Sequence, residues 1–215
     1  MSLSGVIWDL DGVLVDTGEF HYVSWKDTLP GYDIPFSYEL FRKSFGMNNE
    51  GVLTFLMGHQ PDPDLLAEID NRKESAFRQA IRGHAQLLPG VADWLEALHQ
   101  AGVRMAVGSS APMANVEVLV DETGIRPYFQ VLVSANGKPS KPDPWVFLHA
   151  AQQIGVPAEA CWVVEDAVTG VEAAHRAGMR CIAVTTTNTA EALSAAEIVV
   201  DRLDQLSPDV LWEKE

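Results

Sequence analysis

The alternation of hydrophobic and polar positions changes character along the chain. An apolar run at residues 6–10 predicts a buried strand, and Asp11-Gly12 after it predicts a turn. From about residue 16 to residue 85 the sequence is rich in helix formers and aromatic residues and has few β-branched runs. This stretch predicts a small helical unit, with helices at residues 19–29, 38–44, 50–57 and 64–82.

Beyond residue 90, short apolar runs alternate with segments of helical length. Strands are expected at residues 103–107, 131–133, 161–164, 181–184 and 198–200, and helices at residues 91–100, 113–121, 144–153 and 168–177. Such alternation is typical of a parallel sheet covered by helices on both faces. We therefore expect an α/β fold with a Rossmann-like doubly wound parallel sheet. Residues 1–15 and 87–215 would form this core, and the helical unit, residues 16–86, would be an insertion after the first strand.

Composition and charge narrow the classes of function. The 215 residues include 30 Asp+Glu and 15 Lys+Arg, so the formal net charge is −15 at pH 7. This balance argues against nucleic acid and anionic membranes as partners, because phosphate backbones need a clustered basic surface. A phosphate site is still compatible with it if the positive charge is local or comes from a metal.

The remaining composition points to a cytoplasmic protein. No apolar run approaches the roughly 18 residues of a membrane span, and the N-terminus has no basic and apolar signal segment. The two cysteines, Cys161 and Cys181, each lie in a short apolar run, which predicts buried, reduced thiols. We expect a monomer or weak homodimer without membrane or nucleic-acid partners.

Charged and hydroxyl side chains gather where the predicted strands end. They are Asp9, Asp11, Ser109, Ser110, Glu165 and Asp166, with Lys141 in a loop that follows another strand. Ligands of open parallel sheets bind at this edge. Like charges about 4 Å apart repel by roughly 4 kcal/mol at an effective dielectric of about 20. A divalent cation would relieve that repulsion, and oxygen ligands select Mg²⁺.

The same residues resemble the four motifs of the haloacid-dehalogenase-like (HAD) superfamily. The motifs are residues 6–13 (VIWDLDGV), Ser109, Lys141-Pro142 and Glu165-Asp166, in the order and spacing of the family. The resemblance covers nearly the whole chain, including the helical insertion, and is closest to the β-phosphoglucomutase-like branch of phosphatases and mutases. It implies a Mg²⁺-dependent enzyme that acts on a small phosphorylated metabolite, a sugar phosphate or similar compound, through an aspartyl-phosphate.

The resemblance also implies roles for the two acids of the first motif. Asp9 would be the nucleophile, and Asp11 the general acid and base that protonates the leaving oxygen and then activates water. We expect neighbouring negative charge to raise the pKa of Asp11, so that its carboxyl group can hold a proton near neutrality.

The other motifs would bind phosphate and metal. Ser109, helped by Ser110, and Lys141 would hold the phosphoryl group, and Mg²⁺ would bind Asp9, the backbone carbonyl of Asp11 and Asp166, with Glu165 in or just behind that shell. Alternatives remain from the residues themselves. Ser109 could be an N-cap, the side chain of Ser110 could have no role, Lys138 competes with Lys141, and the two acids at 165–166 could be a solvated pair.

In this branch the helical insertion is a cap domain that closes over the site and selects the substrate. His21 and Trp25 lie one turn apart on the first expected helix, so they share a face. Asn48 and Asn49 lie in the loop that reaches the substrate in relatives. Each could instead be structural: His21 as a partly buried cap residue, Trp25 as cap core, and the two asparagines as a turn and helix cap.

Residues of the cap also distinguish mutases from phosphatases in this branch. Mutases of this branch bind a second phosphate with a cap arginine and a lysine; here Asn49 and Phe77 fall at those positions. Neighbouring Arg72, Lys73 and Arg78 match poorly. We therefore predict a phosphomonoester hydrolase, with a hexose-phosphate mutase or a catalytically silent binding or regulatory protein as alternatives. Dehalogenase and phosphonate chemistry are disfavoured, because those relatives lack the second acid of the first motif.

Overall fold

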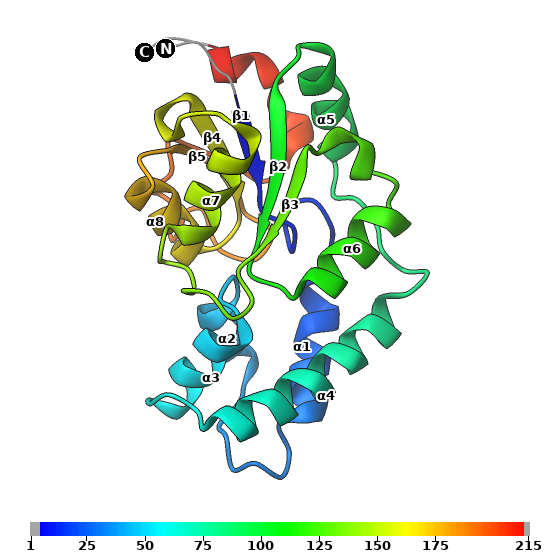
Figure 1. The fold of residues 1–215 in the computed structure, drawn as a ribbon, viewed down its shortest axis with the longest axis vertical. Helices are drawn as coiled ribbons and strands as arrows, with labels where there is room; N and C mark the ends of the chain where they lie inside the picture. Colours follow the sequence, from blue (N-terminus) through cyan, green and yellow to red (C-terminus); the bar gives the residue numbers. More distant parts are fainter. Residues whose placement is uncertain (1–4, 213–215) are drawn as a thin grey trace.

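The structure, a computed structural model, describes residues 5–212. Six strands form one parallel sheet in the order β3-β2-β1-β4-β5-β6 (Figure 1). They are β1 (Gly5–Trp8), β2 (Arg104–Ser109), β3 (Val131–Ser134), β4 (Cys161–Glu165), β5 (Arg180–Val184) and β6 (Ile198–Val200). The strand order reverses at β1, as in doubly wound dinucleotide-binding sheets. The predicted Rossmann-like α/β core is confirmed.

Helices cover both faces of this sheet. They are α5 (Val91–Gln100), α6 (Met113–Glu122), α7 (Trp145–Ile154) and α8 (Val168–Arg176), with 3₁₀ turns at Arg126–Tyr128, Ala158–Ala160, Leu203–Gln205 and Pro208–Trp212. Side chains of a strand alternate between faces. Val6 and Trp8 therefore pack with α5 and α6, whereas Ile7 packs with α7 and α8.

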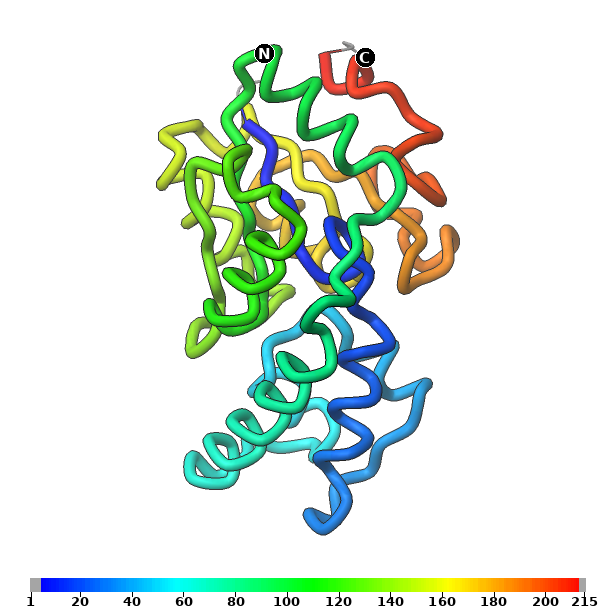
Figure 2. Tube along the Cα trace, turned by 90° about the vertical axis from the view of Figure 1, so that its right-hand side faces the viewer, coloured from blue at the N-terminus to red at the C-terminus, as the bar shows by residue number. Residues whose placement is uncertain are grey.

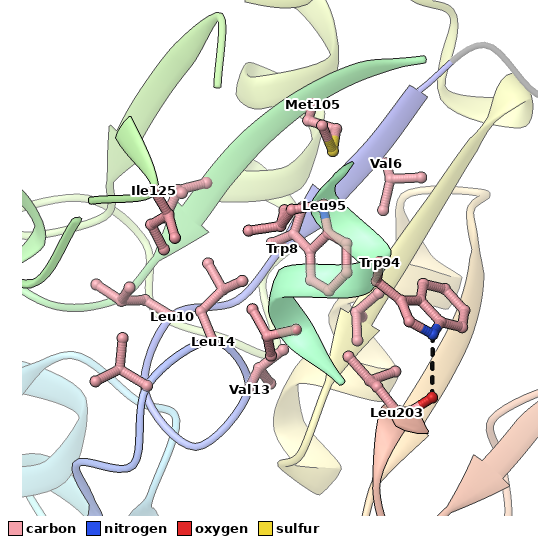
Figure 3. Packing of buried hydrophobic residues seen from close by; sticks show 14 of the residues in the cluster. Val6, Trp8, Leu10, Val13, Leu14, Trp94, Leu95, Met105, Ile125 and Leu203 are labelled. Atoms are coloured by element: carbon pink, nitrogen blue, oxygen red, sulfur yellow. Dashed lines mark hydrogen bonds between the residues drawn. The ribbon is translucent and has the colours of Figure 1, made fainter. Parts of the chain in front are cut away.

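Aromatic packing anchors the α5 face (Figure 3). The rings of Trp8 and Trp94 meet edge to face at 6.2 Å between centroids, a favourable arrangement of ring quadrupoles. The indole N–H of Trp94 donates to the backbone carbonyl of Leu203 at 3.0 Å. A buried polar group is thereby satisfied, and the C-terminal segment is attached to the core.

Four helices lie together beyond one edge of the sheet (Figure 1). They are α1 (Gly18–Thr28), α2 (Tyr38–Ser44), α3 (Asn49–Met57) and α4 (Pro63–Ile81). They enclose their own apolar cluster, which includes Trp25, Phe41, Leu53 and Ile69. No helix within residues 5–212 is long and apolar enough to cross a membrane.

Two neighbouring segments connect these helices to the sheet core (Figure 2). Val15 and Leu87 form an antiparallel bridge, and the N–H of Asp16 donates to the carbonyl of Gln86 at 3.1 Å. The chain therefore leaves and re-enters the core at nearly the same point.

The predicted elements differ from the observed ones mainly at strand ends. The first strand ends at Trp8 rather than residue 10, and the turn follows at residues 12–14. Strand β2 continues to Ser109, two residues beyond its predicted end, since it pairs with the whole of β3. Both shifts place polar side chains directly at the carboxyl edge. Cys161 and Cys181 are buried and free, as expected.

Candidate active site

The motif residues meet at the carboxyl edge of the sheet. Asp9 directly follows β1, and its N–H donates to the carbonyl of Val164 in β4 at 3.0 Å. Gly12 then turns the chain with φ +80°, and a Cβ at this position would collide with the carboxylate of Asp166. Only glycine fits both the backbone conformation and the close approach.

A buried lysine connects two of the acids. The ammonium of Lys141 lies 2.5 Å from Oδ1 of Asp9 and 2.6 Å from Oε1 of Glu165. Burial alone would lower the pKa of Lys141, but the two carboxylates hold it above its usual range. Lys138 lies elsewhere, with Nζ 5.7 Å from the ring centroid of Trp145. Of the two competing lysines, only Lys141 reaches the acidic cluster.

Glu165 organises the cluster from behind. Its Oε1 accepts from Lys141, and its Oε2 accepts the N–H groups of Asp166 at 2.7 Å and Ala167 at 2.8 Å. Both oxygens are therefore engaged with the protein. Of the two expected positions, in the metal shell or just behind it, these contacts favour the second: the side chain fixes Lys141 and the turn that carries Asp166.

The remaining acids suit a hard cation. Asp166 is fully buried; its Oδ2 accepts from the hydroxyl of Thr187, but its Oδ1 has no hydrogen-bond partner in the described part of the chain. Burial, together with the nearby carboxylates and against the charge of Lys141, raises the pKa of Asp9 to about 7 and that of Asp166 well above its usual value. An uncompensated buried carboxylate oxygen is costly unless a cation neutralises it.

This donor set fits Mg²⁺, which binds through few carboxylates and retains waters. Within residues 5–212 no three acidic, histidine or cysteine side chains form a complete metal cage. The fit therefore rests on two carboxylates, Asp9 and Asp166, with the backbone carbonyl of Asp11 as the expected third donor. Asn188 steadies this region, since its side-chain amide donates to the carbonyl of Asp166 at 3.0 Å.

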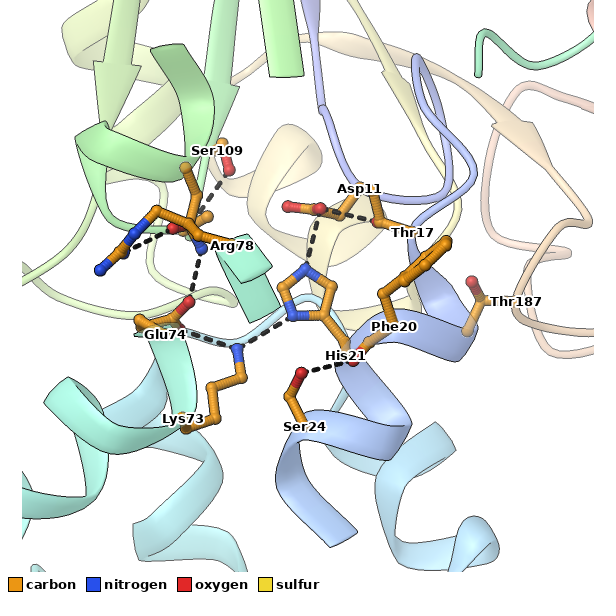
Figure 4. Close-up of polar contacts among 12 residues, drawn as sticks. Asp11, Thr17, Phe20, His21, Ser24, Lys73, Glu74, Arg78, Ser109 and Thr187 are labelled. Carbon is orange, nitrogen blue, oxygen red and sulfur yellow. Dashed lines mark hydrogen bonds and ion pairs between the residues drawn. The ribbon is translucent and has the colours of Figure 1, made fainter. Parts of the chain in front are cut away.

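Asp11 faces the helical unit (Figure 4). Its Oδ1 accepts from the hydroxyl of Thr17 at 2.7 Å and lies 2.9 Å from Nε2 of His21. Burial would raise the pKa of Asp11, but His21 and the hydroxyl of Thr17 lower it below the usual value. The direction is opposite to the one we expect from the sequence, because the donors outweigh the effect of burial.

The other ring nitrogen of His21 contacts Lys73. Nζ of Lys73 lies 2.9 Å from Nδ1 of His21 and donates to Oε1 of Glu74 at 2.7 Å (Figure 4). An ammonium only donates, so Nδ1 accepts and the ring proton sits on Nε2, directed at Asp11. The imidazole stacks on Phe77 with 4.0 Å between centroids, which fixes its orientation.

A small pocket lies between the sheet edge and the helical unit. Its polar lining is Asp9, Asp11 and Ser110 from the core and His21, Ser44, Asn49, Lys73 and Glu74 from the helical unit. The space is about 50 Å³, which holds a few waters and is too small for a sugar phosphate. The core and the helical unit are therefore in close contact around this space.

Ser109 and Ser110 make different contacts. The hydroxyl of Ser110 donates to the backbone carbonyl of Gly46 at 2.6 Å, so it ties the core to the helical unit. Ser109 is buried, and its Oγ accepts the N–H of Ala111 at 3.0 Å. This contact leaves the hydroxyl proton of Ser109 for another acceptor.

Asn48 does not face the pocket. Its Oδ1 accepts the N–H of Gly51 and caps α3, and its amide donates to the carbonyls of Ala135 at 3.0 Å and Lys138 at 2.9 Å. Of the two alternatives left open for Asn48, these contacts favour the structural one. Asn49 and Trp25, in contrast, both line the pocket.

The sequence prediction did not include Thr17, Glu74 or Thr187 in the site, and it considered Lys73 only as a poor match for the second-phosphate cation of the mutases. A signal for Lys73 was present, because Ile69, Lys73, Phe77 and Ile81 follow i, i+4 spacing and all four are buried. A lysine within an apolar stripe is unusual enough to mark a site. Thr187 follows β5, which neighbours β4, so its position at the same sheet edge was readable from the strand order.

Comparison with known proteins agrees with this geometry. The model of a family described as haloacid dehalogenase-like hydrolase matches residues 3–178. The chain is 33% identical over 207 residues to the chloroplastic 5-amino-6-(5-phospho-D-ribitylamino)uracil phosphatase of Arabidopsis thaliana, covering 94% of this chain and 55% of that protein. It therefore spans about half the length of that relative.

Two further proteins match over nearly their full length. Fructose-1-phosphate phosphatase YqaB of Escherichia coli is 33% identical over 184 residues, which cover 84% of this chain and 96% of that protein. The crystal structure of a β-phosphoglucomutase from Clostridium difficile superposes with a TM-score of 0.85 at 25% identity, covering 95% of this chain and 93% of that one.

Proposed function

The chain belongs to the haloacid dehalogenase-like hydrolases, and from that premise we propose that it is a Mg²⁺-dependent phosphomonoester hydrolase acting on a small phosphorylated metabolite. The observation that carries the proposal is the buried cluster of Asp9, Lys141, Glu165 and Asp166, of which Asp9 lines the pocket. The names of the phosphatase relatives support the same reaction class.

Asp9 is the proposed nucleophile. Lys141 holds its Oδ1, whereas its Oδ2 has no partner within residues 5–212, and Asp9 lines the pocket. Attack by Oδ2 on phosphorus forms an aspartyl-phosphate and releases the alcohol; water then attacks the same phosphorus and restores the carboxylate. Lys141 keeps its charge beside the developing negative charge on the phosphoryl oxygens.

Asp11 is the proposed proton carrier. Its carboxylate is held by Thr17 and His21 at the rim of the pocket, and the proton on Nε2 of His21 lies within hydrogen-bond distance. The group would pass a proton to the leaving oxygen and later take one from the attacking water. Ser109 would donate its free hydroxyl proton to a phosphoryl oxygen.

Asp9, Asp166 and the carbonyl of Asp11 would hold Mg²⁺. The bound ion would supply positive charge to the phosphoryl oxygens and compensate the unpaired Oδ1 of Asp166. Lys141 is the only cation that contacts this cluster among the described residues. The cluster holds three carboxylates and one ammonium, so a divalent ion would compensate its excess negative charge.

We also propose that the chain is divided into two domains with different roles. Residues 16–86 act as a cap domain that opens for substrate and closes for catalysis, and residues 1–15 and 87–215 form the catalytic core. The paired connections at Val15 and Leu87 support this boundary. We further propose that the protein is cytoplasmic, which the two free, buried thiols support, and that it is a monomer or weak homodimer.

Phosphate release from p-nitrophenyl phosphate tests the function. We expect release that requires Mg²⁺, stops with EDTA and is absent in Asp9→Asn. A hexose-phosphate mutase would instead depend on a sugar bisphosphate and release little phosphate. If neither p-nitrophenyl phosphate nor a broad panel of phosphomonoesters yields release above the Asp9→Asn control, the hydrolase proposal is wrong.

A further inference from the structure

The cap side of the pocket presents hydrogen-bond acceptors. The side-chain amide of Asn49 donates to Oε1 of Glu74 at 2.8 Å and to Oδ1 of Asp70. With both amide protons committed to carboxylates, the carbonyl oxygen of Asn49 is the atom left for a ligand, and it has no partner within residues 5–212. Since Asn49 and Glu74 both line the pocket, a ligand meets acceptors at this wall.

The positive charge on the cap side of the pocket is paired with a carboxylate. Lys73 is the single lysine among the pocket-lining residues, no arginine lines the pocket, and the ammonium of Lys73 is paired with Glu74 at 2.7 Å. Burial would raise the pKa of Glu74, but Lys73 lowers it, with His21 and Asn49 contributing, so Glu74 is an anion at neutral pH. Asp70 adds a second carboxylate beside Asn49.

Glu74 is also fixed in place. Its Oε2 accepts from the side-chain amide of Asn115 on α6 at 2.5 Å, and the carbonyl of the same amide accepts from Arg78 at 2.9 Å. Asn115 is fully buried. The carboxylate is therefore held by Lys73, Asn49 and Asn115 together, and it cannot swing away to admit an anion without breaking these contacts.

We propose that Asn49 and Glu74 select the substrate: they accept hydrogen bonds from hydroxyl groups of the leaving group and exclude a second phosphate or carboxylate. The preferred class is a monophosphate ester of a small polyol or sugar. This inference rests on the proposed function and deepens it. Trp25, Phe45 and Met47 line the same pocket and supply the apolar surface that the C–H face of such a ligand packs against.

A matched pair of substrates tests the proposal. Fructose 1-phosphate and fructose 1,6-bisphosphate present the same ester and differ by one distant phosphate. We expect kcat/KM of the wild type to be at least tenfold higher for the monophosphate, mainly through KM. Glu74→Gln removes the charge, so the ratio should fall severalfold toward the bisphosphate. Glu68→Gln, an exposed site on the same helix, should keep the wild-type ratio.

The outcomes separate the two proposals. If the wild type hydrolyses p-nitrophenyl phosphate and uses the bisphosphate as well as or better than the monophosphate, this inference fails and the proposed function stands. It also fails if folded Glu74→Gln keeps the wild-type ratio. If Glu74→Gln does not fold, Asn49→Ala replaces it: KM must rise more for fructose 1-phosphate than for p-nitrophenyl phosphate. No hydrolysis of any substrate overturns the proposed function and this inference with it.

Discussion

Gly46 offers a direct test of whether the closed arrangement is the active one. It lies in the loop between α2 and α3 with φ +89°, and its carbonyl accepts the hydroxyl of Ser110 across the pocket rim. A Cβ built on Gly46 would stand 2.7 Å from Cβ of Ala167 and 3.3 Å from Oγ1 of Thr169. Carbon atoms pack best about 3.5–4.0 Å apart, so Gly46→Ala must push the loop off the core by about 1 Å.

Gly58 provides the matched control. It also has a left-handed backbone, φ +75°, but nothing lies within 4 Å of an added Cβ. Both alanine variants should lose about 1 kcal/mol of unfolding free energy from the strained backbone. Only Gly46→Ala should also hinder closure, and we expect its kcat/KM to fall at least tenfold, about 1.4 kcal/mol.

The assay combines urea unfolding with steady-state hydrolysis of p-nitrophenyl phosphate. Gly58→Ala should stay within about twofold of the wild-type kcat/KM, as expected away from the site. The reasoning is refuted if the two variants have equal kcat/KM while both are folded. In that case the contact of Gly46 with Ala167 does not belong to the catalytically competent state.

Three further outcomes follow from the buried groups. Burial raises the pKa of Cys161 to about 12 and that of Cys181 well above its usual value, so a thiol reagent at pH 8 should label the native protein far more slowly than the urea-unfolded chain. Asp11→Ala should abolish turnover but retain Mg²⁺ binding in calorimetry, because its expected metal donor is the backbone carbonyl; intact activity would remove it as proton carrier. Glu74 has a lowered pKa, so its stabilisation is present above its unfolded pKa of about 4.3 and is lost as pH falls through the lowered value. Glu74→Gln should cost about 3 kcal/mol of unfolding free energy at pH 7, and a gap to wild type that does not narrow below pH 4 would contradict this assignment.

The sequence predicted what depends on chain order. Strand ends in a parallel sheet share one edge, so Asp9, Ser109, Glu165 and Asp166 could be brought together before any coordinates were known. Their spacing along the chain also carried the family resemblance. The order of the strands within the sheet, in contrast, came only from the structure.

What the sequence did not reveal depends on contacts between the two parts of the chain. Asn48 and Asn49 are adjacent and chemically identical, yet one caps α3 against the core loop and the other faces the pocket. The lowered pKa of Asp11 likewise comes from His21 and Thr17, whose approach depends on how the cap sits on the core. The sequence alone does not show how the cap packs against the core.

The central claim is that Asp9 carries the phosphoryl group during turnover. Wild-type protein with Mg²⁺ is mixed with a radiolabelled phosphomonoester, quenched in acid at successive early times, digested and analysed for labelled peptides. We expect label on the peptide that contains Asp9, sensitive to hydroxylamine as acyl phosphates are, and none in Asp9→Asn. Full turnover by Asp9→Asn, or wild-type turnover in which label never reaches Asp9 at any early time, would contradict the account.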